Sequence, residues 1–232
     1  MKKLLFTVLM LVCGLQAMPA QAAAETAQPF VRWAIYTAAD GKTAELTETV
    51  NNYNNAVRQS KGVLAVYGGT DENGVMRFLE IYKDEATCAA LQSNTGLNEK
   101  RKAIARLAST NKIMAADAFL LQSKVTGIAD KPRMARLVID PQQLDEYKKV
   151  LAKEMRASVA NEPGVLALLA TTETANPNIF HLLELYADDE AYKAHIAGKY
   201  FQEYNKAVQN MVTDKTLIIN EPQNIALSGS QF

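Results

Sequence analysis

Residues 182–195 read Leu-Leu-Glu-Leu-Tyr-Ala-Asp-Asp-Glu-Ala-Tyr-Lys-Ala-His, and this stretch decides the fold. Its first part has the apolar and aromatic residues of a β-strand, and the part after the acidic turn has the composition of a helix. Residues 78–86 read Phe-Leu-Glu-Ile-Tyr-Lys-Asp-Glu-Ala and repeat that pattern. A repeat at this distance predicts a fold made of two copies of one unit.

The similarity extends outward from these two stretches. Gly62-Val63-Leu64-Ala65 recurs as Gly164-Val165-Leu166-Ala167, 102 residues later. In each copy the hydrophobic periodicity predicts the order strand, helix, strand, strand, helix, strand, which is the ferredoxin-like unit. We place the copies at residues 30–124 and 133–222, with a linker between them and a C-terminal tail at residues 223–232.

The expected elements follow from turn residues and apolar stripes. The first copy is expected to hold strands at 31–36, 62–67, 75–82 and 113–121, and helices at 43–60, 85–92 and 97–108. In the second copy, Asp140 and Pro141 begin a helix, Asn176-Pro177-Asn178 forms a hairpin turn, and a helical region continues to about Met211.

Two such units in one chain solve a packing problem. A four-stranded sheet with helices on one side leaves its other face uncovered. We therefore predict an α+β protein in which the two units pack sheet to sheet as an intrachain pseudo-dimeric α+β barrel. Strands buried on both faces lose strict alternation, as residues 166–170 and 182–186 do. The expected state is a monomer with an internal pseudo-dimer, and further oligomerisation stays open.

The N-terminus has the features of a secretory signal. Lys2 and Lys3 precede an apolar run at 4–15, and Ala20-Gln21-Ala22 fits a small-residue cleavage site. We therefore interpret residues 1–22 as a signal peptide and expect a periplasmic or secreted protein. No other stretch approaches the ~20 apolar residues that a membrane-spanning helix needs, so no membrane span is expected.

Composition excludes several classes of function. The 25 basic residues balance the 25 acidic ones, so nothing favours nucleic acid as a partner. Cys13 leaves with the signal peptide, and Cys88 then has no partner for an intrachain disulfide. With only two histidines and no CxxC, HExxH, Walker or GxGxxG motif, we expect no metal site and no cofactor.

The candidate site residues lie in the second copy. A glutamate in a buried strand needs a partner, so Glu184 and its counterpart Glu80 have either a structural salt bridge or a catalytic role. His195 follows on the next helix, at a position where we align Ala90 of the first copy. It is either a satisfied core residue or part of a pocket beside Tyr200, Phe201 and Tyr204.

Several segments of the second copy follow one family pattern, namely Gly164-Val165-Leu166, Leu183-Glu184-Leu185-Tyr186, Ala191, and the Ala-His-Ile-Ala-Gly-Lys-Tyr-Phe run at 194–201. In these segments the second copy resembles the antibiotic biosynthesis monooxygenase (ABM) family. The family typically shows Ala-His-x-x-(Ser/Thr)-x-His-Phe in the last segment, and Tyr200 replaces its second histidine. The first copy shares Leu79-Glu80-Ile81-Tyr82 but lacks the helix signature, so we interpret it as a degenerate ABM-like domain.

The resemblance implies a dimeric α+β barrel with a pocket between sheet and helices in each unit. Relatives oxidise polycyclic aromatics or quinols with dioxygen and without metal or flavin. A haem-degrading branch uses a tryptophan and a haem-ligating histidine on the second helical region. His195 and Asn205 hold those positions here, so haem degradation is not expected.

These implications lead to one hypothesis and one alternative. The hypothesis is an exported, cofactor-independent monooxygenase, hence an oxidoreductase, that acts on a small hydrophobic, aromatic or quinol molecule. His195 and Tyr204 are its catalytic candidates, and the substrate-binding candidates are Tyr186, Glu184, Tyr200 and Phe201. The alternative is a non-enzymatic module of the cell envelope that binds a small ligand or has a structural role.

Overall fold

The computed structural model describes residues 28–124, 127–128, 131–222 and 226–227. The predicted signal peptide at 1–22 lies outside these ranges, as does most of the predicted tail at 223–232. Within the described part of the chain, no helix has the length and apolar character needed to cross a membrane.

The N-terminal unit follows the expected order of elements. Gly62 ends the turn after its first helix with a φ of 84°, a conformation that glycine adopts without steric cost. Asp84 and Asn94 cap the next two helices by accepting hydrogen bonds from the backbone N–H of Thr87 and Leu97. The elements are β1 (Phe30–Ala38), α1 (Thr43–Arg58), β2 (Val63–Asp71), β3 (Met76–Tyr82), α2 (Glu85–Gln92), α3 (Thr95–Leu107) and β4 (Ala108–Ser123).

The C-terminal unit repeats this order. Asp188 caps the second α-helix of this unit, as Asp84 caps the second α-helix of the first unit 104 residues earlier. The elements are β6 (Lys131–Ile139), the 3-10 turn η1 (Pro141–Gln143), α4 (Leu144–Asn161), β7 (Val165–Glu173), β8 (Asn176–Tyr186), α5 (Asp189–Ala197), α6 (Lys199–Ala207) and β9 (Val212–Pro222). Two short strands, β5 (Gly127–Ile128) and β10 (Ala226–Leu227), pair with each other outside the units.

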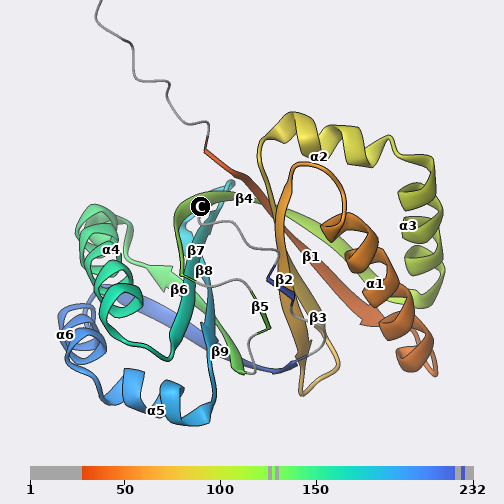
Figure 1. The fold of residues 1–232 in the computed structure, drawn as a ribbon. Coiled ribbons are helices and arrows are strands. Elements are labelled where there is room, and N and C mark those ends of the chain that lie inside the picture. The colour runs from red at the N-terminus through yellow and green to blue at the C-terminus, as the bar shows by residue number, and fades with distance from the viewer. Residues whose placement is uncertain (1–27, 125–126, 129–130, 223–225, 228–232) are drawn as a thin grey trace, which may run out of the picture.

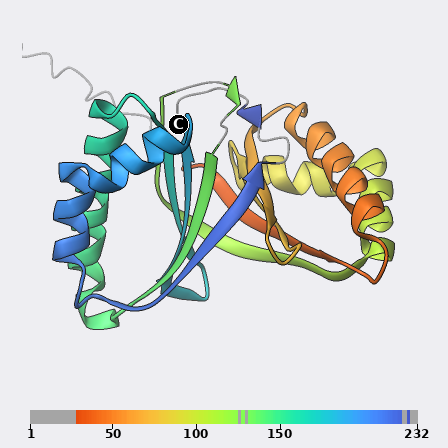
Figure 2. The same cartoon turned by 90° about the horizontal axis from the view of Figure 1, so that it is seen from below.

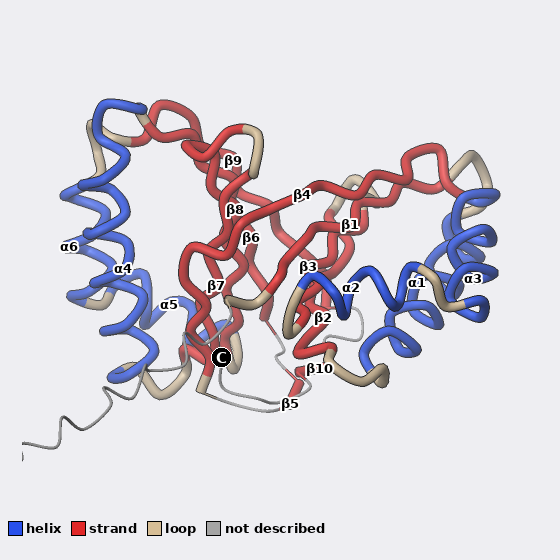
Figure 3. The backbone as a smooth tube through the Cα atoms, turned by 90° about the horizontal axis from the view of Figure 1, so that it is seen from above, coloured by secondary structure: helices blue, strands red, loops and turns tan. Residues whose placement is uncertain are grey.

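The eight long strands close into one antiparallel barrel in the order β1-β3-β2-β9-β6-β8-β7-β4. Each unit contributes a ferredoxin-like sheet, and the sheets join at β4–β7 and at β2–β9. The helices of the two units cover opposite outer sides, with the strands between them (Figures 1 and 2). Figure 3 shows the same layering by colour, with helices only at the two flanks. The predicted intrachain pseudo-dimeric barrel is therefore confirmed.

Three apolar clusters hold these layers together. The barrel interior contains inward-facing side chains of both units, and Trp33 there donates a hydrogen bond to Thr171 Oγ1 across the pseudo-dimer at 3.0 Å. The other two clusters each lie between one sheet and its own helices. Because the helices cover only the outer face of each sheet, every unit has a separate outer core in which a site can form.

Three expected boundaries are wrong. The last strand of the first unit begins at Ala108 instead of residue 113, because its first half pairs with β1 and its second half with β7. The helical region before Met211 is broken at Gly198, whose extended backbone ends α5 and begins α6. The hairpin turn lies before Asn176, and Pro177 is part of β8. Long-range strand pairing, which local composition does not report, sets the first boundary. The third boundary is set within the hairpin itself, where Glu173 pairs with Asn176.

Candidate functional site

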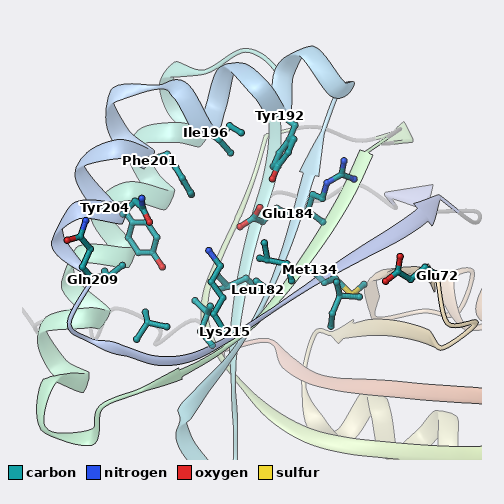
Figure 4. Close-up of a pocket in the computed structure, with 18 residues that line it drawn as sticks. Glu72, Met134, Leu182, Glu184, Tyr192, Ile196, Phe201, Tyr204, Gln209 and Lys215 are labelled. Atoms are coloured by element: carbon teal, nitrogen blue, oxygen red, sulfur yellow. The ribbon is translucent and has the colours of Figure 1, made fainter.

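A cavity of about 370 Å³ lies in the C-terminal unit, between the outer face of the sheet and helices α5 and α6. This volume is typical of a small-molecule site. Tyr192, Ile196, Phe201 and Tyr204 point into it from the helices, and Leu182 and Glu184 from β8 (Figure 4). Most of its wall is apolar or aromatic. The polar side chains in the wall are Glu72, Arg133, Glu184, Asn205, Gln209 and Lys215.

Glu184 places a carboxyl group in the wall of this cavity. It is half-buried, and the hydroxyl of Tyr186 donates a hydrogen bond to its Oε2 at 2.8 Å. Burial raises the pKa of Glu184, against the hydrogen bond from Tyr186 and the attraction of His195, Lys215 and Arg133. A carboxyl group with a raised pKa beside an apolar cavity is a candidate for general acid or base catalysis.

The N-terminal unit neutralises the equivalent carboxylate. Glu80 is fully buried and lies opposite Arg32 in the sheet. The Nε of Arg32 is 2.5 Å from the Oε2 of Glu80. The hydroxyl of Tyr82 donates to the same oxygen. Burial, the largest single effect, lowers the pKa of Arg32, but the charges of Glu80 and Tyr82 and the hydrogen bond to Glu80 together outweigh burial and raise that pKa. In this copy the structural salt bridge that the sequence allowed is present.

Arg133 is the counterpart of Arg32 and lies opposite Glu184 in the sheet, yet it binds elsewhere. Its guanidinium lies over the ring of Tyr192 at 4.8 Å from the centroid, and its Nη2 is 3.6 Å from Asp189 Oδ1. An arginine on an aromatic face gains a cation–π interaction. The residue that corresponds to Tyr192 in the first copy is Cys88, which offers no such face. The aromatic ring at position 192 thus draws the arginine away from the glutamate.

His195 lies behind the large cavity and does not line it. Only 3% of its surface is exposed, and its Nδ1 is 2.7 Å from Glu162 Oε2. The imidazole packs between the rings of Tyr186 and Phe201, at centroid distances of 5.4 and 5.2 Å. It borders a second, smaller cavity of about 20 Å³, which Glu184 also lines. The structure thus makes His195 a bonded core residue that is in contact with the site.

The capping residues also correct the alignment of the two copies. Asp84 and Asp188 hold the same position at the start of α2 and α5, so the helices align with an offset of 104 residues. With that offset, Leu91 and not Ala90 corresponds to His195. The change follows from the backbone, because an N-cap fixes which residues of a helix face the sheet.

Glu154 is a site residue that the sequence reading missed. It lies on α4, is 7% exposed, and accepts a hydrogen bond from Ser158 Oγ at 2.7 Å. Burial raises its pKa to about 7, against the effects of Ser158 and His195. The signal was available, since Glu154 follows Leu151 by three residues and precedes Ser158 by four, on the apolar stripe of the helix. The burial pattern of α1 places Tyr53 at this position in the first copy.

The remaining candidates separate into two groups. Phe201 and Tyr204 line the large cavity, and the Tyr204 hydroxyl is 3.1 Å from that of Tyr147. Tyr200 lies instead in an outer groove of about 190 Å³ between α4 and α6, where Lys199 packs over its ring. Tyr186 does not line the large cavity, but its hydroxyl donates a hydrogen bond to Glu184. The helix turn therefore places the adjacent residues Tyr200 and Phe201 on two sides of α6, and Tyr204 borders both spaces.

A metal centre finds no support among the described residues, since no group of three or more His, Cys, Asp and Glu side chains there has suitable geometry. The other histidine, His181, lies apart from this site. Its Nε2 is 2.9 Å from Glu173 Oε1, and its ring packs against Trp33 at the barrel interior.

Solved structures resemble this fold over nearly their whole length. A proposed monooxygenase from Lactobacillus acidophilus NCFM has 20% identity and a TM-score of 0.77, with 87% of this chain and 97% of that chain covered. A proposed monooxygenase from Fusobacterium nucleatum subsp. nucleatum ATCC 25586 has 20% identity and a TM-score of 0.79, with coverages of 87% and 95%. At these identities the likeness shows the fold alone.

Sequence comparisons place the chain in a family. A proposed antibiotic biosynthesis monooxygenase from Bacteroides thetaiotaomicron VPI-5482 is 40% identical over 43% of this chain and 95% of its own, with a TM-score of 0.42. No curated protein matches the chain. Residues 133–207, which contain Glu184, His195 and the helices over the cavity, match the antibiotic biosynthesis monooxygenase domain. The C-terminal unit therefore belongs to the antibiotic biosynthesis monooxygenase (ABM) family.

Proposed function

We propose that this protein is a monooxygenase that uses dioxygen to oxidise a small aromatic hydroxy compound or quinol in the cavity of its C-terminal unit. Membership of the ABM family supports a monooxygenase-type reaction. The observation that carries the proposal further is the position of Glu184. Its arginine partner is bound to Tyr192, so the carboxyl group faces an aromatic cavity instead of a buried salt bridge.

Glu184 is assigned the role of general base. Its carboxylate accepts the hydroxyl proton of the substrate, which leaves an electron-rich phenolate. The phenolate gives one electron to dioxygen, and the resulting radical and superoxide combine into a peroxide at a ring carbon that carries hydrogen. Glu184 returns its proton to the peroxide, the ring carbon loses its hydrogen as a proton, and water leaves as the carbonyl forms. The substrate thus loses two hydrogens, gains one oxygen atom and supplies all the electrons.

The other residues of the cavity have supporting roles in this scheme. Phe201, Tyr192 and Tyr204 supply the aromatic wall against which a planar ring packs, with offset or edge contacts. Tyr186 holds the Glu184 carboxylate in one orientation. We assign the base to Glu184 in place of His195, because the imidazole does not line the cavity that the substrate would occupy.

A plugged cavity tests this function. The purified chain is expected to consume dioxygen with members of a hydroquinone panel and to place one atom of ¹⁸O₂ in the product. Asn205 is exposed on α6 and lines the cavity, so Asn205→Trp should block entry and lower kcat/KM by at least about tenfold. Lys206→Trp adds the same bulk one residue away and is the matched control. Ligand binding without dioxygen uptake would show a binding module instead.

We further propose that the protein is exported. The support is the sequence of residues 1–22, with two lysines, an apolar run and Ala20-Gln21-Ala22. The intact mass of the protein from its native cells should correspond to a chain that begins at Ala23. A mass that still includes residues 1–22 would contradict export by this route.

A further inference from the structure

Three hollow spaces follow one another through the C-terminal unit. The large cavity lies on one side of Glu184, and the small cavity of about 20 Å³ lies on the other. Glu154 lines the small cavity and also the outer groove between α4 and α6. Glu184 therefore borders the large and the small cavity, and Glu154 borders the small cavity and the groove. The three spaces together connect the aromatic cavity with the surface.

His195 lies between these carboxyl groups. Its Nε2 is 3.8 Å from Glu154 Oε1, which is beyond hydrogen-bond distance. Its Nδ1 is held by Glu162 at 2.7 Å, so the ring has a fixed orientation. Glu154, Glu184 and His195 all line the small cavity, which has the volume for a single water molecule. One water there would be within reach of all three groups.

These groups do not belong to the shared architecture of the two units. Tyr53, Val57 and Leu91 take the positions of Glu154, Ser158 and His195 in the first copy. In that copy the strand glutamate, Glu80, also forms a salt bridge with Arg32. Burying carboxyl groups is unfavourable, and the second buried carboxyl group, Glu154, belongs to the unit whose strand glutamate faces a cavity, whereas Tyr53 holds its position in the first copy. The association between the two features indicates a common role.

We propose that Glu184, His195 and Glu154 form a proton relay between the substrate cavity and the groove between α4 and α6. The inference rests on the proposed function, in which Glu184 gains and loses a proton in each turnover. A ring that fills the large cavity covers that side of Glu184. The proton then passes from Glu184 to water in the small cavity, onto Glu154 directly or through His195, and out to solvent in the groove. A proton returns to Glu184 along the same path, and apart from these proton transfers no bond forms or breaks.

The electrostatics of the cluster suit this role. Burial raises the pKa of both carboxyl groups, that of Glu154 to about 7, so Glu154 can hold a proton near neutral pH. The groups that face Glu154 come from four elements: Ser158 and Glu162 at the end of α4, His195 on α5, Tyr204 on α6, and Glu184 on β8. Lys153 and Glu203 border the same groove but form an exposed pair with each other.

Glu154→Gln tests the relay, because the amide keeps an acceptor for Ser158 and cannot carry the proton. We expect kcat for dioxygen consumption to fall by about 10–100-fold with KM unchanged, and the solvent deuterium isotope effect on kcat to rise. Added imidazole or formate should restore kcat in a saturable manner by entering the groove. Glu203→Gln removes a carboxyl group from the same groove and should leave all of these quantities unchanged.

A merely structural role predicts a different result. In that case Glu154→Gln would lower the melting temperature, and small acids would not restore kcat. That result, or an unchanged kcat and isotope effect, would overturn the relay.

A second measurement separates the relay from the proposed reaction. In the Asn205→Trp background, time-resolved infrared spectroscopy after a pH jump follows protonation of Glu184, with Glu184→Gln identifying its band. The relay predicts slower protonation when Glu154→Gln is added, even if no substrate is ever oxidised. Equal rates would refute the relay and leave the proposed function standing.

Discussion

Glu184→Gln is expected to lower kcat for dioxygen consumption by about 10²–10⁴-fold, the range that loss of a general base produces. The amide keeps the shape of the side chain and its contact with Tyr186, so substrate binding should change little. The carboxylate must be ionised to accept a proton, and burial raises its pKa. Wild-type kcat should therefore rise with pH through that raised pKa and level off above it, whereas the variant should show a flat profile over the same range.

Stability should not follow activity in this variant. The folded-state pKa of Glu184 is raised above its unfolded value, so ionisation of this group destabilises the folded protein as pH rises above the unfolded pKa. Glutamine removes that effect, and the melting temperature should be equal to that of the wild type or higher. Glu80→Gln is the matched change in the first copy, and this variant should retain the wild-type kcat. If Glu184→Gln kept more than half of the wild-type kcat, the assignment of the base would be wrong.

Arg32→Met is expected to produce the largest loss of stability, about 3–5 kcal/mol, because it leaves a buried carboxylate without its charge partner. Glu80 is fully buried, its Oε2 accepts both of its hydrogen bonds, and its Oε1 has no partner. For a chain of this size, about 2–4 °C is lost per kcal/mol, which corresponds to a melting temperature lower by about 6–20 °C. Calorimetry or urea denaturation at pH 7 measures the change.

Two further variants make this test specific. Arg133→Met removes the equivalent arginine from the second copy, where it is partly exposed and 3.6 Å from Asp189. Pairs of that kind contribute about 0–1 kcal/mol, so the melting temperature should change by only a few degrees. The double change Arg32→Met with Glu80→Gln should recover most of the lost stability, because no buried charge then remains. Equal losses from the two arginine variants would mean that the copies do not differ as described.

The repeat made the architecture predictable from sequence. Its two Leu-Glu-x-Tyr strands and its two Gly-Val-Leu-Ala strands fix the number of units and the order of their elements. The alternation of Val31, Trp33 and Ile35 also predicts one strand face, and Val31 and Trp33 are in the barrel interior. These features are readable because each depends on residues close together in the chain, through turn chemistry and a period of two or 3.6.

The site was only partly predictable. Glu184, Phe201 and Tyr204 were candidates, and all three line the cavity. Tyr200 faces the other side of α6, and Glu154 was not recognised, although its place on an apolar stripe was a signal. Assigning it a role required the positions of His195 and Glu184, which come from a different helix and from the sheet.

The sequence by itself determined that the chain contains two ferredoxin-like units, each with a glutamate and a tyrosine on its third strand. Only the tertiary structure decided which of the two glutamates is neutralised. Arg32 and Arg133 are opposite equivalent residues in their sheets, but one bonds Glu80 and the other lies on Tyr192. A charged side chain binds the best partner within its reach, and those partners come from strands and helices about 50–60 residues away. Their competition exists only once the elements have packed.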